Sequence, residues 1–360
     1  MRTIAFYIII SAFIFSGCKL LQPKSVSIND SDLENNSNLV EASPDYYLEF
    51  IGLKNYTAQQ VVDSMRAKQG NTITGAKVLN ACSAVMQRDL GFEYSSSKFV
   101  NPNYGYITLI ESKPDYGVVE KSLPKDSLAI IEHWFPDGKD ISDPVNKFSM
   151  NFYLQFLRTD GEKLSMKYKL IYNKYATEEE REFTDGILSH INQLDMSKEL
   201  PLARETLRSD GNLANRYMAL IILMRSMPTN NDLGLIFEQY FYNDNHLKSF
   251  STYVLRESIK LRPDFDWSNT THSVRNLING AAVHDYDTIL KILTDNNFSP
   301  ELADQVLDPR SPILQDYLNA YESSMSEKAL NLIKQLSGDK VNNKKEANQW
   351  LASQYHKVQK

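Results

Sequence analysis

Hydrophobic residues in the first half of the chain are spaced first at helical and then at strand intervals. Thr57 and Gln60 form a capping-box pattern in front of an apolar stripe, which predicts a short helix. A second predicted helix carries one buried stripe, formed by Val78, Cys82, Val85 and Met86. After Gly91 the apolar residues alternate with polar ones, which is the period of a strand with one buried face.

Several stretches with this alternation are predicted strands. They are residues 104–110, 127–134, 151–157 and 163–172, and the turn Asp160-Gly161 joins the last two as a hairpin. Such strands bury one face and expose the other, which suits an antiparallel sheet with helices on one side. Residues 46–195 are therefore predicted to form an α+β domain.

From residue 196 onward the apolar residues follow only the helical period. Ten of the 14 glycines lie in residues 1–190, and the i, i+3, i+4, i+7 template recurs in the remainder. The clearest stripes are Val274 to Ala281, Tyr286 to Leu293, Leu314 to Tyr321 and Ala329 to Leu336. Prolines interrupt the short helices, so residues 196–360 are predicted to be an all-α chain of helical hairpins. These prolines are Pro228, Pro263, Pro300, Pro309 and Pro312.

The apolar runs 213–224, 247–259 and 274–281 make this half resemble a degenerate HEAT-type α-solenoid. The spacing between the runs is irregular, and no fixed residue recurs in register. The resemblance implies stacked helix pairs that present an extended surface. An irregular helical bundle is the alternative.

The start of the chain carries an export pattern. Arg2 precedes the apolar run 4–15, which is shorter than the ~20 residues of a membrane-spanning helix and fits a signal peptide. The residues Phe15-Ser16-Gly17-Cys18 resemble the lipobox of bacterial lipoproteins, with Phe15 where leucine is usual. The resemblance implies removal of residues 1–17 and acylation of Cys18, whereas an ordinary cleaved signal is the alternative.

The residues after the lipobox predict where the chain is held. Residues 18–45 are rich in Ser, Asn, Asp and Glu without a sustained apolar period, so a lipidated flexible tether is expected. Lys19 stands where aspartate retains some lipoproteins in the inner membrane. The resemblance therefore implies a lipid-anchored protein of the cell envelope, in the outer membrane and facing the periplasm.

Composition excludes some classes of protein. Hydrophobic residues at 42% and charged residues at 23% are ordinary for a soluble globular protein. The formal net charge is −6, and no basic run with interleaved aromatics occurs, which argues against nucleic-acid binding. The chain has 2 cysteines, so with Cys18 acylated Cys82 has no intramolecular disulfide partner.

Two positions invite a chemical interpretation but also have a structural one. Cys82 is a lone thiol, but it lies on an apolar stripe without a histidine nearby in sequence, so a core residue is expected. Glu132 and His133 are followed by acidic residues at a spacing that differs from an EF-hand loop, so a solvated turn is preferred to a cation site. These acidic residues are Asp137, Asp140 and Asp143.

Three further candidates also have both a functional and a structural interpretation. His190 follows Asp185 at i+5 instead of the i+4 spacing of paired ligands, so a core or interface histidine is expected. His284 lies beside acidic residues before a helix, where acids stabilise the helix dipole. The last helix, with Ala347 and Leu351 on its apolar face, is expected to cap the array instead of binding a membrane or a partner.

These observations predict a non-enzymatic function. No catalytic, cofactor-binding or metal-binding residue and no cofactor are predicted, and the sequence lacks nucleophile-elbow, P-loop, dinucleotide and zincin motifs. The expected function is a non-enzymatic scaffold, held to membrane lipid through Cys18, that binds a protein partner. The alternative is an envelope hydrolase that acts on glycan or peptide through carboxylates of the α+β domain.

Overall fold

The computed structural model describes residues 28–112, 122–125, 129–135, 178, 186, 189–226, 229–242, 244–260, 265–281 and 286–358. By their internal contacts they divide into two units. The first is Met1–Lys113 with Asn319–Ser326, and the second is Pro114–Leu318 with Glu327–Lys360. This division lies at residue 113, whereas the sequence pattern placed a boundary at 195. Most of residues 114–188 lie outside the described part of the chain, so that boundary stays a prediction.

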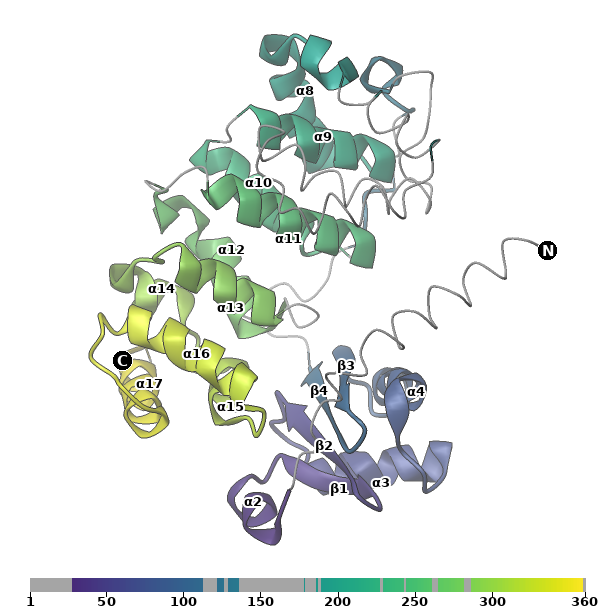
Figure 1. The fold of residues 1–360 in the computed structure, drawn as a ribbon, viewed down its shortest axis with the longest axis vertical. Helices are drawn as coiled ribbons and strands as arrows, with labels where there is room; N and C mark the ends of the chain where they lie inside the picture. The colour runs from purple at the N-terminus through teal and green to yellow at the C-terminus, as the bar shows by residue number, and fades with distance from the viewer. Residues whose placement is uncertain are drawn as a thin grey trace, which may run out of the picture. The chain divides into compact units, whose positions relative to one another are not determined.

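The described residues of the first unit form a four-stranded mixed sheet in the order β1-β2-β4-β3 (Figure 1). The strands are β1 (Leu39–Ser43), β2 (Tyr46–Ile51), β3 (Tyr94–Asn101) and β4 (Tyr104–Ile110). An antiparallel sheet was expected; the outer pairs are antiparallel, but the central pair β2 and β4 is parallel. Two helices and β3 separate β2 from β4, which is the long connection that parallel pairing needs.

Helices α3 (Ala58–Gln69) and α4 (Gly75–Asp89) form the core of this unit with the sheet. The predicted capping box starts α3, because the Thr57 hydroxyl accepts the Gln60 N–H and the Gln60 side chain accepts the Thr57 N–H. Cys82 of α4 is fully buried in the core, as expected from its apolar stripe. The α+β class of the first part of the chain is thereby confirmed.

Residues 28–45 differ from the expected flexible tether. They contain helix α2 (Asp30–Asn35) and β1, which forms one edge of the sheet, so the prediction is wrong for these residues. Long-range contacts stabilise the short strand: Arg66 of α3 donates to the Glu41 and Ala42 carbonyls, each at 3.0 Å. The Ser43 hydroxyl also accepts the Ile73 N–H at 2.6 Å. A strand of five residues has a weak sequence signal.

The segment 319–326 belongs to the first unit although its neighbours in sequence belong to the second. The N–H of Tyr321 donates to the buried carboxylate of Glu49 at 3.0 Å, and the Tyr104 hydroxyl donates to the same carboxylate. Burial raises the pKa of Tyr104 well above its usual value, so this phenol stays protonated as a donor. Tyr321 therefore lies beyond the helix Ile313–Asn319, whereas the sequence pattern placed it at the end of the apolar stripe of that helix.

Residues 129–135 do not form the predicted strand. Residues 129–131 are irregular, and Glu132–Trp134 is the short 3-10 helix η1. The side chain of Asn215 pairs with the main chain here, accepting from Ile131 N at 3.0 Å and donating to Ala129 O at 3.1 Å. Because a helix side chain supplies these hydrogen bonds, no strand ladder forms at these residues. The predicted hairpin 151–172 lies outside the described residues.

The described part of the second unit is helical, which confirms the all-α class of the second half. Its helices are α8 (Met196–Ser209), α9 (Leu213–Arg225), α10 (Asn230–Gln239), α11 (Asn245–Lys260), η3 (Trp267–Thr270), α12 (Thr271–Asn276), η4 (Leu277–Ala281), α13 (Tyr286–Asp295), η6 (Pro300–Leu302), α14 (Ala303–Val306), α15 (Ile313–Asn319), α16 (Ser323–Leu336) and α17 (Lys344–Val358). The ends of α15 and α16 that face each other in sequence belong to segment 319–326.

The helices of the second unit stack in two layers. Helices α8, α10, α12 and α14 contact one another in succession, and so do α9, α11 and α13 (Figure 1). The pairs α8 with α9 and α10 with α11 pack side by side, as helical hairpins do. Helix α9 is buried along its length from Ala214 to Met224, so it lies inside the array. This arrangement matches the hairpin array that the sequence predicted.

Predicted stripes of the array are buried where they were expected. In α13 and α16 the apolar positions of the helical template are almost fully buried. They are Tyr286, Ile289, Leu290 and Leu293, and Ala329, Leu332, Ile333 and Leu336. Within the described residues, the helices lack the length and apolar character that a bilayer-spanning segment requires.

Candidate functional site

Two histidines that the sequence singled out come together at the first helix pair of the array. His133 lies in η1, and His190 lies in a helical turn just before α8. The Nε2 atom of His190 hydrogen-bonds to the carbonyl oxygen of His133 at 2.6 Å. Residues 129–135 are therefore fixed beside α8 and α9, although 57 positions separate the two histidines.

Glu199 in the first turn of α8 is the centre of this site. It is 7% exposed, and its Oε2 atom accepts the indole N–H of Trp134 at 2.6 Å. The same oxygen lies 2.9 Å from Nε2 of His133, whose side chain is 54% exposed. A buried carboxylate is costly unless it is paired and hydrogen-bonded, and the indole and imidazole supply these partners.

Asn215 at the start of α9 holds the main chain of the segment. One hydrogen of its side-chain amide goes to Ala129 O, and the other goes to Asp210 Oδ2 at 2.6 Å. This leaves the amide oxygen facing the N–H of Ile131. Asn215 and Asp210 are both fully buried, so the hydrogen bond between them fixes the orientation of the amide.

Arg216 positions the loop that carries Asp210. Its guanidinium is fully buried and donates to the carbonyls of Asp210 and of Leu207, the latter at 3.1 Å. It also donates to the side chain of Gln239 in α10 and lies 4.3 Å from the ring centre of Tyr242. Burial lowers the pKa of Arg216. The cation satisfies carbonyls at the end of α8 and joins the first helix pair to the second.

A histidine held by a carboxylate can act as a base. Within the described residues, the side chain of His133 hydrogen-bonds to Glu199 and its main-chain carbonyl oxygen hydrogen-bonds to His190. In the same part of the chain, no group of three His, Cys, Asp or Glu side chains could hold a metal ion. The site provides polar side chains that hydrogen-bond to the main chain of residues 129–131 and a buried carboxylate that accepts the indole N–H of Trp134.

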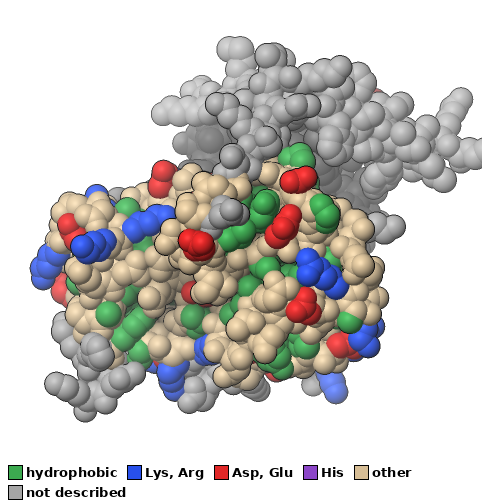
Figure 2. All heavy atoms as spheres, turned by 90° about the horizontal axis from the view of Figure 1, so that it is seen from below, with side chains coloured by type: hydrophobic (Ala, Val, Ile, Leu, Met, Phe, Trp, Pro, Cys, Tyr) green, Lys and Arg blue, Asp and Glu red, His purple; other side chains and the backbone are tan. Residues whose placement is uncertain are grey.

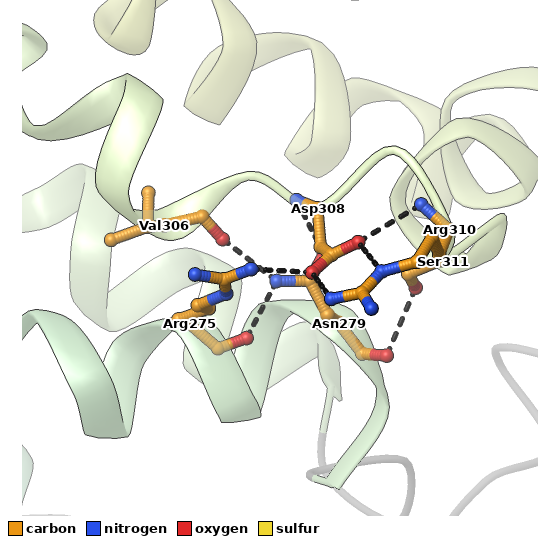
Figure 3. Close-up of polar contacts among 6 residues, drawn as sticks. All are labelled: Arg275, Asn279, Val306, Asp308, Arg310 and Ser311. Atoms are coloured by element: carbon orange, nitrogen blue, oxygen red, sulfur yellow. Dashed lines mark hydrogen bonds and ion pairs between the residues drawn. The ribbon is translucent and has the colours of Figure 1, made fainter. Parts of the chain in front are cut away.

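A second polar cluster is centred on the buried carboxylate of Asp308. It accepts from Arg275 Nη2 at 2.5 Å, and from Arg310 Nε at 2.9 Å and Nη2 at 2.8 Å (Figure 3). Burial alone would raise the pKa of Asp308, but the hydrogen bonds from both arginines outweigh burial and lower it to about 2. The carboxylate is therefore ionised at neutral pH.

Asn279 of the π-helical turn η4 completes the cluster. Its amide donates to Arg275 O and Val306 O, each at 2.7 Å, and accepts the Asp308 N–H at 3.2 Å. The hydroxyl of Ser311 donates to the Asn279 carbonyl at 2.9 Å. These contacts connect the loop after α14 to the end of α12 (Figure 3), so the cluster stabilises the packing of this part of the array.

The other residues singled out from the sequence lie elsewhere or outside the described part. Cys82 is in the core of the first unit, where burial raises the pKa of its thiol to about 11. In α17, Ala347 and Leu351 are buried, as the expected terminal helix requires. The acylation site, the acidic loop and one histidine lie outside the described residues: Cys18, Asp137, Asp140, Asp143 and His284.

Sequence reasoning missed Glu199, Asn215 and Asp210, because no motif links them to residues 129–135. One signal was present: Asn215 and Arg216 are polar residues in the otherwise apolar helix 213–224. Polar side chains in a helix that is buried on all sides must find partners, so they mark a site of tertiary contact.

Comparison with known proteins identifies no relative of this chain. No protein-family model matches it, and no curated protein or solved structure matches it significantly.

Proposed function

We propose that this chain is a lipoprotein of the bacterial cell envelope whose helical array binds a protein partner without catalysing a reaction. The observation that carries the proposal is the two-layer stack of helix pairs from α8 to α14. Stacked hairpins contact mainly their neighbours and leave a long continuous surface on which a partner can lie. The lipobox pattern at residues 15–18 supports the anchor.

The proposed lipid anchor determines where in the cell envelope the protein meets its partner. Acylation of Cys18 with more than one chain stabilises membrane attachment, because each buried CH₂ contributes about 0.8 kcal/mol. Lys19 favours the outer membrane, with the folded part in the periplasm. The protein would then present its array to envelope proteins near the membrane surface.

On the face shown in Figure 2, acidic and basic side chains are interspersed, and hydrophobic side chains lie scattered among them. Together with the net charge of −6, this supports a protein partner over a nucleic acid.

Acyl labelling tests the anchor. Wild-type protein should incorporate a labelled fatty acid and sediment with membranes, whereas Cys18→Ala should be unlabelled and released. Ser16→Ala is the matched control, because it keeps a small residue two positions before the cysteine and should be labelled normally. Membrane association of the Cys18→Ala variant would contradict the lipoprotein assignment.

Photo-crosslinking in intact cells tests the scaffold. A photoreactive amino acid is placed at Glu205 or Lys291, which are exposed on the array, and at Gln59 on the first unit as a control. The array positions should capture the same partner, which Gln59 and an unrelated lipoprotein should not capture. Absence of a shared product from both array positions would refute the proposed function.

A further inference from the structure

Residues 129–135 contact the array in the way that a separate peptide would. We propose that α8 and α9 carry a peptide-binding site that residues 129–135 occupy as an intrachain ligand. The partner displaces this ligand with a segment that carries a tryptophan. The proposal rests on the proposed function, because it names the kind of partner that the array binds.

The first argument is how the backbone is recognised. Asn215 contacts the carbonyl of Ala129 and the N–H of Ile131, two residues apart, through one side-chain amide. Such a contact is made to main-chain groups and is independent of the side chains of the bound segment. Asp210, which belongs to the array, accepts the other hydrogen of this amide and so orients it toward the segment.

The second argument is the pattern of burial in the segment. Trp134 is 0% exposed and Phe135 is 3% exposed, whereas Ala129, Glu132 and His133 are exposed. A bound peptide shows this pattern, with aromatic anchors buried in the receptor and the other side chains in solvent. The buried carboxylate of Glu199 accepts the indole N–H, which favours tryptophan over phenylalanine at the anchor position.

The third argument is that the segment can leave without breaking an element of the array. Within the described residues, the hydrogen bonds from its main chain to other main-chain groups are local, from Trp134 N to Ile131 O at 2.8 Å and from Phe135 N to Glu132 O at 3.0 Å, and its remaining main-chain contacts are to side chains of the array. The contact of Arg204 with Asp232 between α8 and α10 does not involve the segment. Local opening of a short segment costs less free energy than unfolding of a helix core.

A peptide-binding assay tests the proposal with the full chain carrying Cys18→Ala. The probe is a fluorescent peptide with the sequence of residues 129–135, and its binding is followed by polarisation. A chain with Trp134→Ala has lost its own anchor, so it should bind the probe at least tenfold more tightly than a chain that keeps Trp134. A probe with alanine in place of tryptophan should not bind. Equal, weak binding to both chains would overturn the proposal.

The same background allows the contacts to be tested one at a time. Adding Glu199→Gln or Asn215→Leu to the Trp134→Ala chain should weaken probe binding at least tenfold. Adding Glu205→Gln, an exposed position of α8, is the matched control and should leave it unchanged. If the affinity for the probe is unchanged by the substitutions at Glu199 and Asn215, the peptide binds elsewhere.

Hydrogen exchange of the chain with Trp134 intact keeps the proposal testable if Trp134→Ala does not fold. The amides of Ile131, Trp134 and Phe135 should exchange faster than those of α9, because the segment opens locally. Exchange of these amides only together with those of α9 would show that the segment is an integral part of the fold.

The two proposals can fail separately. If a partner is crosslinked at Glu205 or Lys291 but the probe peptide does not bind, this inference alone is refuted. Probe binding without any crosslinked partner would refute only the proposed function.

Discussion

Replacing Asp308 with asparagine removes a buried negative charge from its cluster with Arg275 and Arg310 while keeping the size of the side chain. Burial opposes ionisation of Asp308, but the arginine hydrogen bonds prevail and lower its pKa from 3.8 to about 2. One pKa unit corresponds to about 1.4 kcal/mol, so the ionised carboxylate stabilises the fold by roughly 2.5 kcal/mol at neutral pH. Asp308→Asn should lower the free energy of unfolding by about that amount.

The loss has a defined dependence on pH. Because the pKa of Asp308 is lower in the folded than in the unfolded chain, the stabilisation is complete at pH values well above 3.8. It declines as the pH falls toward 2, and roughly half of it should remain at pH 3. The difference in stability between wild type and Asp308→Asn should shrink accordingly.

Urea unfolding followed by tryptophan fluorescence measures this difference. Trp134, Trp267 and Trp350 all belong to the second unit, so their signal reports on the unit that holds Asp308. Asp304→Asn, an exposed acid in α14, is the control and should change stability little. A stability difference that is the same at pH 7 and pH 3 would refute the ion-pair reasoning, and so would an equal loss in Asp304→Asn.

Two further predictions concern the core of the first unit. Gly105→Ala would place a Cβ atom 2.7 Å from the Tyr46 hydroxyl and 3.0 Å from the Lys98 carbonyl oxygen. The substitution should destabilise the unit by about 1–3 kcal/mol, measured by urea unfolding with the labelling of Cys82 as the signal. Unchanged stability would show that the sheet has room for the added Cβ atom. Cys82 itself is fully buried with a pKa raised to about 11. In Cys18→Ala protein at pH 8 it should therefore react with a thiol reagent only after unfolding, and rapid labelling of the native protein would contradict its burial.

The candidate site shows how far sequence reasoning reached. His133 and His190 were singled out by residue type, and the structure brings them together. Their roles did not follow from type, because the carboxylate that pairs with His133 is Glu199, 66 positions away. Residues 127–134 have the alternation of a strand, yet the partner of Ile131 is the side chain of Asn215 in a helix. A period of two indicates which side chains face inward without identifying what they face.

The sequence by itself determined the features that depend on near neighbours. The start of α3 needs only Thr57 and Gln60, three positions apart, and the buried faces of α13 and α16 follow from the helical period. Tertiary structure decided the parallel pairing of β2 with β4, the strand β1 within the expected tether, and the contacts of residues 129–135 with α8 and α9. The physical reason is that each of these depends on a hydrogen bond or a buried surface shared by residues far apart in sequence. Such contacts exist only once the chain has folded and brought those residues together.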